Sequence, residues 1–182
     1  MRKKTVKIKL TSDSIDDAIN ELKENKKWLK EKTQELVDKL AGRGYRIACS
    51  NLYHADYDGD NDVKCDMVEL DENRVLVVAL GGKSLFIEFG TGIRYPDDHP
   101  YKETYGMVGR GEYGKGQGKD PTGWSYTGDA RYQGTRGVFI GETKNGKYKF
   151  HTYGNPANRC MYDAKCQVED EYEEIVRRVF ND

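Results

Sequence analysis

The first residues of this sequence that could do chemistry are four aspartates spaced two apart: Asp56, Asp58, Asp60 and Asp62. With Asp58 as position one of a calcium-binding loop, Glu69 stands at position twelve, where such loops place a bidentate glutamate. Position six of the loop needs glycine for a sharp turn, and here it is Val63. The flanking residues also follow the pattern of strands rather than of paired helices. We therefore interpret the cluster as a solvated acidic turn and predict no metal site.

A glycine-rich stretch carries two partial nucleotide-binding patterns. Residues 109–114 match the G-x-G-x-x-G spacing, but that motif needs a strand before it and a helix that begins at its glycines, and the sequence predicts neither. Gly118-Lys119 departs from the phosphate-loop pattern, because Asp120 stands where Ser or Thr must hold the metal. We therefore predict no nucleotide cofactor.

No set of nucleophile, base and orienting group can be traced in the sequence. His54, His99 and His151 are far apart, and no Ser-His-Asp, Cys-His or H-E-x-x-H pattern includes them. Glu88 lies inside an apolar run, so its charge is either solvated on the opposite face or paired, because burying it alone is costly. A lone carboxylate is more often structural than a general acid. We predict no catalytic residue, no cofactor and no enzymatic activity.

The composition bounds the class of protein. The 182 residues suit a single domain over 1–182, and 30 Lys and Arg against 31 Asp and Glu give a net charge of -1, without the basic excess of a nucleic-acid-binding protein. No apolar run is long enough for a membrane span, and none follows the basic first residues as a signal would require, so we expect neither membrane insertion nor export. The four cysteines form no C-x-x-C pair, and we predict reduced structural thiols.

The elements that must position these residues begin with a short strand at residues 6–10, where apolar side chains alternate with lysines. A helix follows, capped by Ser12 or Ser14, with an apolar stripe at heptad-like spacing. We expect it to stop at Gly42 and Gly44. The stripe is long enough to pack on the chain's own sheet or against a neighbouring subunit, and both possibilities stay open.

The middle of the chain changes to a β pattern. Residues 45–80 predict an antiparallel meander with a hairpin connection at 71–73. A long Gly- and Tyr-rich loop is predicted over 90–137, and we expect it to be mobile in the free protein and ordered in an assembly. Residues 138–152 predict a hairpin around Asn145-Gly146, because Asn-Gly is the strongest short turn signal.

A final helix is predicted from the helical spacing of apolar residues between Met161 and Val179. The predicted fold class is therefore α+β: a small antiparallel sheet, made of a meander and a hairpin, packed with a long N-terminal helix and a C-terminal helix.

Two segments of the sequence resemble a known family. LFIEFGTG at residues 85–92 is followed by His99-Pro100, and Gly154-Asn155-Pro156-Ala157 is followed by Met161-Tyr162 and Ala164. Both segments resemble motifs of the small head-tail joining, or tail-completion, proteins of tailed phages and prophages, the minor tail components with an EFGTG motif. The chain departs from that family at Arg159-Cys160, where Pro-Phe is expected, and residues 93–137 are longer than usual for it.

The resemblance carries implications for fold, site and partners. It favours a short helix over residues 83–89, and it implies a virion protein of the tail or neck, assembled in the bacterial host cytoplasm as an oligomeric ring, commonly six-fold. Its partners would be its own copies, the tail tube or tail terminator protein, and the head-side adaptor or stopper protein, with DNA only in transit. The motif residues, with an interface or turn role, are Phe86, Glu88, Phe89, Gly90, Thr91, Gly92, His99, Pro100, Gly154, Pro156, Ala157 and Met161.

Two alternatives stay open beside the interpretation as a structural tail protein. The chain could be a hydrolase or a small ligand-binding protein in which the glycine-rich loop acts as a lid over Glu88 and a histidine such as His99. Direct DNA binding is a weaker possibility, because the charges balance.

Overall fold

The computed structural model describes residues 11–55, 57, 61–92, 99–107, 122–128 and 137–181, and its architecture is α+β, as predicted. In chain order the elements are α1 (Ser12–Tyr53), β1 (Lys64–Asp71), β2 (Arg74–Leu80), α2 (Ser84–Phe89), β3 (Trp124–Gly128), β4 (Val138–Glu142), β5 (Tyr148–Thr152) and α3 (Cys160–Asn181). The predicted strand at 6–10, the glycine pattern at 109–114 and the first three aspartates of the acidic cluster lie outside the described residues.

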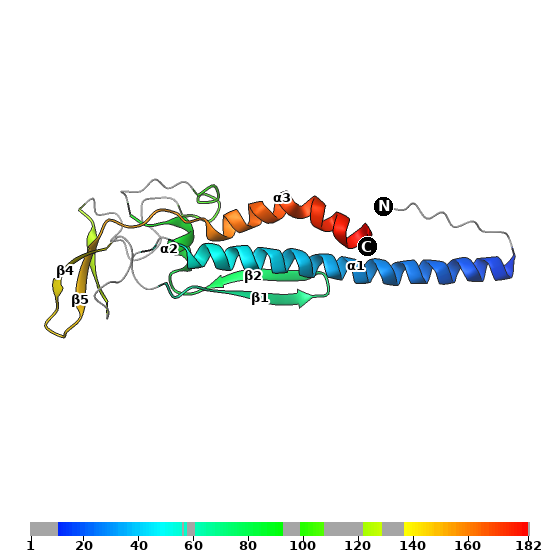
Figure 1. Ribbon diagram of the computed structural model, residues 1–182, viewed down its shortest axis with the longest axis horizontal. Helices are drawn as coiled ribbons and strands as arrows, with labels where there is room; N and C mark the ends of the chain where they lie inside the picture. Colours follow the sequence, from blue (N-terminus) through cyan, green and yellow to red (C-terminus); the bar gives the residue numbers. More distant parts are fainter. Residues whose placement is uncertain are drawn as a thin grey trace.

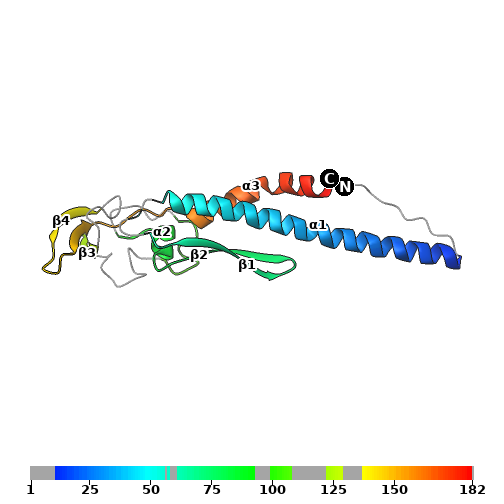
Figure 2. The ribbon, with the colours of Figure 1, turned by 60° about the horizontal axis from the view of Figure 1, so that its bottom comes forward.

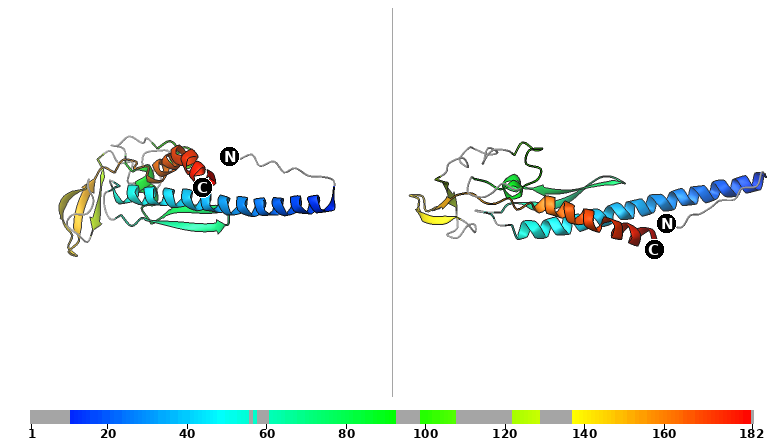
Figure 3. Two further views of the ribbon diagram at one scale, coloured as in Figure 1. Left: turned by 45° about the vertical axis from the view of Figure 1, so that its right-hand side comes forward. Right: turned by 90° about the horizontal axis from the view of Figure 1, so that it is seen from above.

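The elements form an elongated molecule built along α1 (Figure 1). The C-terminal half of α1 has α3 along one side and the hairpin of β1 and β2 along another, and the two further views agree on this arrangement (Figures 2 and 3). The three-stranded sheet lies at the end of the molecule beyond α2. None of the helices described here is both long and apolar enough to cross a membrane.

The prediction that the first helix stops at Gly42 and Gly44 is wrong, and so is the strand predicted to begin at Tyr45. The helix α1 continues through both glycines and ends at Tyr53. Each glycine inside a helix costs about 1 kcal/mol relative to alanine. Burial of Ile47 and of other side chains in the last two turns offsets that cost, because a fully buried aliphatic side chain contributes about 1.5–3 kcal/mol.

The position of Gly44 explains why the helix tolerates it. A Cβ atom at this position would stand 3.6 Å from the Val168 side chain of α3 and 3.8 Å from that of Val77 in β2. Gly44 therefore lies where α3 and the hairpin both come close to α1, at a distance where a methyl group would make ordinary van der Waals contact with both. Tertiary packing, rather than local propensity, determines where α1 ends.

The hairpin of β1 and β2 confirms the two later strands of the predicted meander and their connection at residues 71–73. The strands are antiparallel, with Met67 opposite Val77, and they connect at residues 72–73. The Asp71 carboxylate accepts hydrogen bonds from the Asn73 amide at 2.9 Å and from the Arg74 guanidinium at 2.7 Å, which holds the turn.

The core lies where α1, the hairpin and the start of α3 meet. One cluster joins Ile47 and Ala48 of α1 to Ala164 of α3, and a second joins Leu52 of α1 to two residues near the junction of α2 and α3: Ile87 and Cys160. A bidentate ion pair between Arg43 and Glu171, at 2.6 and 2.7 Å, ties α1 to α3 further along.

The second sheet has three antiparallel strands in the order β3-β5-β4. The hairpin of β4 and β5 is confirmed, with Gly146 at φ +73° in its turn. The prediction that all of residues 90–137 form a loop is wrong for β3, which pairs with β5. Trp124 and Tyr126 alternate with small polar residues, a strand pattern, and the Tyr126 ring stacks on Phe150 with 5.4 Å between ring centroids. The strands thus belong to two sheets, which are separate in sequence and in space.

Candidate functional site

The candidate site is the junction where residues 85–92 meet residues 154–162. The short helix predicted here is confirmed as α2, which ends at Phe89 and presents Glu88 in its last turn. Gly90 and Gly92 follow with φ values of +76° and +82°, a left-handed conformation that favours glycine. The chain reverses here and runs back beside the segment that leads into α3.

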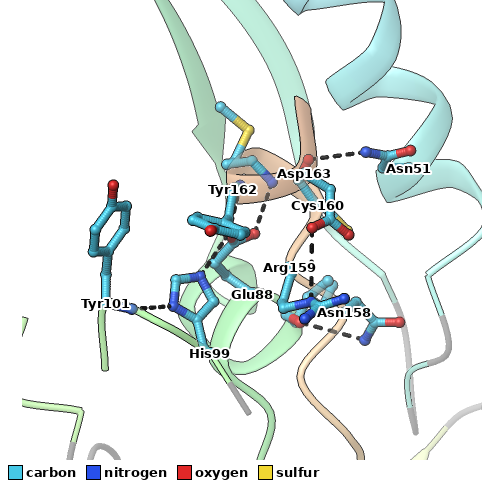
Figure 4. Close-up of polar contacts among 11 residues, drawn as sticks. Asn51, Glu88, His99, Tyr101, Asn158, Arg159, Cys160, Tyr162 and Asp163 are labelled. Atoms are coloured by element: carbon cyan, nitrogen blue, oxygen red, sulfur yellow. Dashed lines mark hydrogen bonds and ion pairs between the residues drawn. The ribbon is translucent and has the colours of Figure 1, made fainter. Parts of the chain in front are cut away.

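Glu88 caps the first turn of α3 from 73 residues away in the sequence (Figure 4). Its Oε2 atom accepts a hydrogen bond from the Met161 amide at 2.9 Å, and its Oε1 atom accepts one from the Tyr162 amide at 3.0 Å. The first amides of a helix have no partner within the helix, and the positive end of the helix dipole favours a carboxylate. Glu88 therefore supplies the cap that the sequence around Cys160 lacks.

His99 is the third hydrogen-bond partner of the Glu88 carboxylate. Its Nε2 atom lies 3.0 Å from Glu88 Oε1, and its Nδ1 atom accepts a hydrogen bond from the Tyr101 amide at 3.1 Å (Figure 4). Because Nδ1 accepts, the proton of the neutral ring is on Nε2, which donates to Glu88. The His99 residue is only 3% exposed, and its ring lies 4.1 Å from that of Phe89 between centroids. The pair is therefore a buried polar contact with a fixed tautomer.

A short backbone bridge fixes the two segments to each other. The Thr91 amide donates to the Asn155 carbonyl at 2.8 Å, and the Asn155 amide donates to the Thr91 carbonyl at 3.1 Å. Gly90, Gly92 and Gly154 all lie against backbone of the opposite segment, so that a Cβ atom at any of them would overlap that backbone. Glycine is required at these positions both for the conformation and for the close approach.

Three asparagines add contacts that the sequence did not single out as functional. The Asn155 side-chain amide donates to the Phe86 carbonyl at 3.3 Å, and the Asn158 backbone amide donates to the Ile87 carbonyl at 2.9 Å. Asn51 of α1 donates to the Cys160 carbonyl at 3.0 Å (Figure 4). No spacing rule predicts these pairs, because their partners are backbone carbonyls more than sixty residues away. They join α1, α2 and α3 into one junction.

Beside the carboxylate lies a hollow of about 380 Å³ with a mainly apolar lining. Its wall includes a group of aromatic rings packed edge to face, among them Tyr101 and Tyr162 with 5.4 Å between centroids. Lys165 stands at the hollow with its Nζ atom 5.9 Å from the Tyr101 ring, and the hydrogen bond with Glu169 holds the pKa of this lysine above its ordinary value. The lining residues are Leu85, Glu88, Phe89, His99, Tyr101, Tyr105, Met107, Met161, Tyr162 and Lys165.

The chemistry open to this junction is limited, because its polar atoms already have partners. Both carboxylate oxygens of Glu88 and both ring nitrogens of His99 are engaged in hydrogen bonds. Burial raises the pKa of the Cys160 thiol to about 12, which leaves it protonated and unreactive at neutral pH. Over the described part of the chain, no three His, Cys, Asp or Glu side chains are placed to hold a metal ion. The geometry is that of a structural clamp.

The structure brings the motif residues of the two segments together. Most of them line the junction, and the exposed Pro100 follows the buried His99. The other two histidines lie elsewhere: His54 follows the end of α1, and His151 is on β5. The full set placed at or beside the junction is Phe86, Glu88, Phe89, Gly90, Thr91, Gly92, His99, Pro100, Gly154, Pro156, Ala157 and Met161.

At the departure from the motif, Arg159-Cys160, the first of the two residues has a backbone conformation that proline cannot adopt. Arg159 has φ +51°, which a proline ring cannot adopt, since it fixes φ near -65°. Its amide still donates to the Glu88 carbonyl at 3.1 Å. Cys160 is 1% exposed and fills a core position next to Leu52 and Ile87, so a small apolar thiol stands where the motif has a large ring.

The chain matches no protein-family model, no curated protein and no solved structure in the comparisons made. The resemblance to tail-completion proteins therefore stays a prediction that depends on the two motif segments and on the clamp they form.

Proposed function

We propose that this protein is a structural subunit of the tail of a phage, or of a phage-derived tail, that completes the tail at its head-proximal end. The observation that carries the proposal is the convergence of the two resembling segments. Residues 85–92 and 154–162 are separated by more than sixty residues, yet their backbones bridge at Thr91 and Asn155. Glycines and the Glu88 cap serve this contact directly, which gives both motifs one shared physical purpose.

The chemistry of the junction also supports a structural role. A catalytic carboxylate and histidine need a free lone pair or proton within reach of a substrate. Here the Glu88 carboxylate caps the start of α3, and the His99 ring holds residues 99–101 by accepting a hydrogen bond from the Tyr101 amide. We infer that Glu88 braces the turn rather than contacting a neighbouring subunit, since its side chain is 12% exposed and has three partners within the chain.

In this proposal, several copies of the protein form a ring in the virion, and DNA passes through this ring. Its partners are further copies of itself, the tail tube or terminator protein, and the head-side adaptor. A net charge of -1 suits passing contact with DNA, because dense phosphate contacts would hold the DNA in place. Mixed surface charge suits the registration of subunits more than tight binding.

The mass of the purified protein in solution tests the proposal. Light scattering would be recorded for the protein alone and after mixing with a phage tail-tube protein. We expect a defined ring, or a specific co-complex with the tail-tube protein. The variant Gly154→Ala should disrupt the clamp, and we expect it to lose the co-complex. A wild-type protein that remains monomeric and binds no tail protein would contradict the proposed function.

The hollow beside Glu88 favours one second candidate, a small ligand-binding protein. Its volume of about 380 Å³ lies within the range of small-molecule pockets, and residues 99–107 of the predicted loop form part of its wall. The engagement of Glu88 and His99 speaks against hydrolysis in it. A higher melting temperature in the presence of apolar aromatic compounds would support ligand binding. If no compound in a panel of them changed the melting temperature, this candidate would be removed.

A further inference from the structure

The four cysteines of the chain differ in their surroundings. Cys49 near the end of α1 and Cys65 near the start of β1 are partly exposed, whereas Cys160 is 1% exposed in the core. Cys166 on α3 is partly exposed like the first two, and all four are free thiols. The reaction of a thiol with an oxidant requires access from solvent. Cys49, Cys65 and Cys166 are therefore the candidates for modification.

Cys65 lies on the inner face of the β1–β2 hairpin, beside the last turns of α1. It packs against the core cluster that contains Ala48 and also against the cluster that contains Leu52. Its cross-strand partner, Ala79, packs against the second cluster as well. Cys49 stands between Ala48 and Leu52 in the sequence, and it is a surface neighbour of Leu52, since residues three apart meet on a helix. The packing of the hairpin therefore places Cys65 next to Cys49.

The two thiols meet at the contact between α1 and the hairpin. A hydrogen bond links the Cys65 side chain to the Cys49 side chain. A second hydrogen bond links Cys49 to the side chain of Tyr45, one turn earlier on α1. The Cys49 sulfur is thus held between the Tyr45 hydroxyl and the Cys65 thiol. A small further approach would bring the two sulfur atoms to the bond length of a disulfide, about 2.05 Å.

Cys166 and Cys160 provide the contrast within the same chain. The side chain of Cys166 has a hydrogen bond with the Tyr162 hydroxyl, one turn earlier on α3, and a hydroxyl group cannot form a disulfide. Cys160 belongs to the core cluster against which Cys65 packs, but it is enclosed there. Access from solvent and a thiol in hydrogen-bond contact occur together at Cys49 and Cys65.

We propose that Cys49 and Cys65 form a modification site, at which a small-molecule disulfide such as oxidised glutathione converts the two thiols into a disulfide bond between α1 and β1. The bond would enclose residues 50–64 and tie the end of α1 to the hairpin that packs on it. Because such a link reduces the conformational freedom of the unfolded chain, the oxidised protein should unfold at a higher urea concentration than the reduced protein.

The oxidation consists of two thiol–disulfide exchanges. Burial and the hydrogen bond with Cys49 raise the pKa of the Cys65 thiol to about 12, so Cys65 keeps its proton at neutral pH. The Cys49 thiolate attacks one sulfur of the glutathione disulfide, forms a mixed disulfide and releases one glutathione thiolate. Cys65 then loses its proton and attacks the Cys49 sulfur, which breaks the mixed disulfide and releases the second glutathione. Two protein thiols are oxidised, one glutathione disulfide is reduced, and the two protons end on the released glutathione thiols.

The redox state of the pair should follow the surroundings of the protein. Disulfides persist outside the cell, whereas the cytosolic glutathione and thioredoxin systems keep thiols reduced. If the protein is the proposed tail subunit, the pair is reduced during assembly in the host and oxidised after release. The pairing itself depends on the fold of a single chain and not on the tail role.

Peptide mapping by mass spectrometry identifies the bond. The full-length reduced protein is incubated with oxidised glutathione at neutral pH, its remaining thiols are alkylated in urea, and it is digested without reduction. We expect one linked peptide pair, with Cys49 joined to Cys65, and alkylated Cys160 and Cys166. The same oxidation in concentrated urea is the control, because an unfolded chain should pair its cysteines in several ways.

Three outcomes for the native wild-type protein would overturn the proposal: a dominant link between any other two cysteines, glutathione on both Cys49 and Cys65, or four alkylated cysteines. The mapping of the wild type is decisive by itself and does not depend on how well any variant folds.

Serine variants test the order of the two exchanges. Cys65→Ser should stop the reaction at the mixed disulfide, with glutathione on Cys49, whereas Cys49→Ser should leave Cys65 without glutathione. Cys166→Ser, at a partly exposed thiol with a hydroxyl partner, is the matched control and should form the link like the wild type. Circular dichroism and the melting temperature verify folding. Equal amounts of glutathione on the Cys49→Ser and Cys65→Ser variants would contradict the assigned order of attack.

The outcomes for this site and for the proposed function are distinguishable. Absence of the linked peptide would remove the disulfide and leave the tail role in place. A protein that forms the link but neither assembles into a ring nor binds a tail-tube protein would keep the disulfide and lose the tail role.

Discussion

Replacing Glu88 with alanine should weaken the fold at one identifiable point. The substitution removes the acceptor for the Met161 and Tyr162 amides, and loss of a helix cap costs about 1 kcal/mol. It also leaves the buried Nε2–H group of His99 without an acceptor, which costs about 1–3 kcal/mol. We expect the free energy of unfolding to fall by about 3 kcal/mol, and the melting temperature by roughly 6–12 °C for a chain of this size.

Glu88→Gln refines the expectation. The glutamine oxygen can replace Oε1 and keep His99 and Tyr162, but its amide group then faces the Met161 amide as a second donor. We expect a loss of about 1–2 kcal/mol, intermediate between the wild type and the alanine variant.

Urea unfolding monitored by circular dichroism measures both variants. The control is Glu169→Ala, which removes an exposed carboxylate from an i,i+4 pair with Lys165 and should change stability by less than about 0.5 kcal/mol. If Glu88→Ala changed the free energy of unfolding no more than this control does, the reasoning that Glu88 braces the junction would be refuted.

Three further predictions concern glycine, cysteine and pH. Gly154→Ala should cost at least about 3 kcal/mol in urea unfolding, because its Cβ would overlap opposite backbone, whereas Gly106→Ala, at φ +67° with open space, should cost about 1–2 kcal/mol; similar losses would contradict the close approach. Cys160 should resist alkylation in the native protein at pH 8, since burial raises its pKa to about 12 and leaves roughly one thiolate in ten thousand; mass spectrometry showing modification at the rate of a free thiol would argue otherwise. The hydrogen bonds from Arg43 lower the pKa of Glu171 from its ordinary value of 4.5, so this pair stabilises the fold above that pH and loses its effect as pH falls through the lowered pKa. The stability difference between wild type and Arg43→Met should therefore shrink below about pH 4, and a difference independent of pH would refute this assignment.

Local signals in the sequence determined the elements whose structure depends on near neighbours. The turn at Asn145-Gly146 specifies the β4–β5 hairpin, because few other residues adopt its left-handed conformation. The alternation around residues 64–80 specifies the first hairpin, and helical spacing specifies α3. The charge of Glu88 within an apolar run predicted that it would be either solvated or paired, and it is paired.

Contacts between distant residues decided the rest, and no local pattern encodes them. Gly42 and Gly44 predict a helix end, but α3 and the hairpin pack against α1 at Gly44, so the end of α1 depends on the tertiary structure. β3 forms because it can pair with the edge of β5, although most of the sequence around it lacks a strand pattern.

The candidate site, too, was determined partly by local sequence and partly by contacts between distant residues. The sequence by itself determined which glycines turn the chain and which carboxylate stands among apolar residues. Only the tertiary structure placed that carboxylate at the start of α3 with His99 against it, because a hydrogen bond between residues 73 positions apart depends on how the whole chain packs.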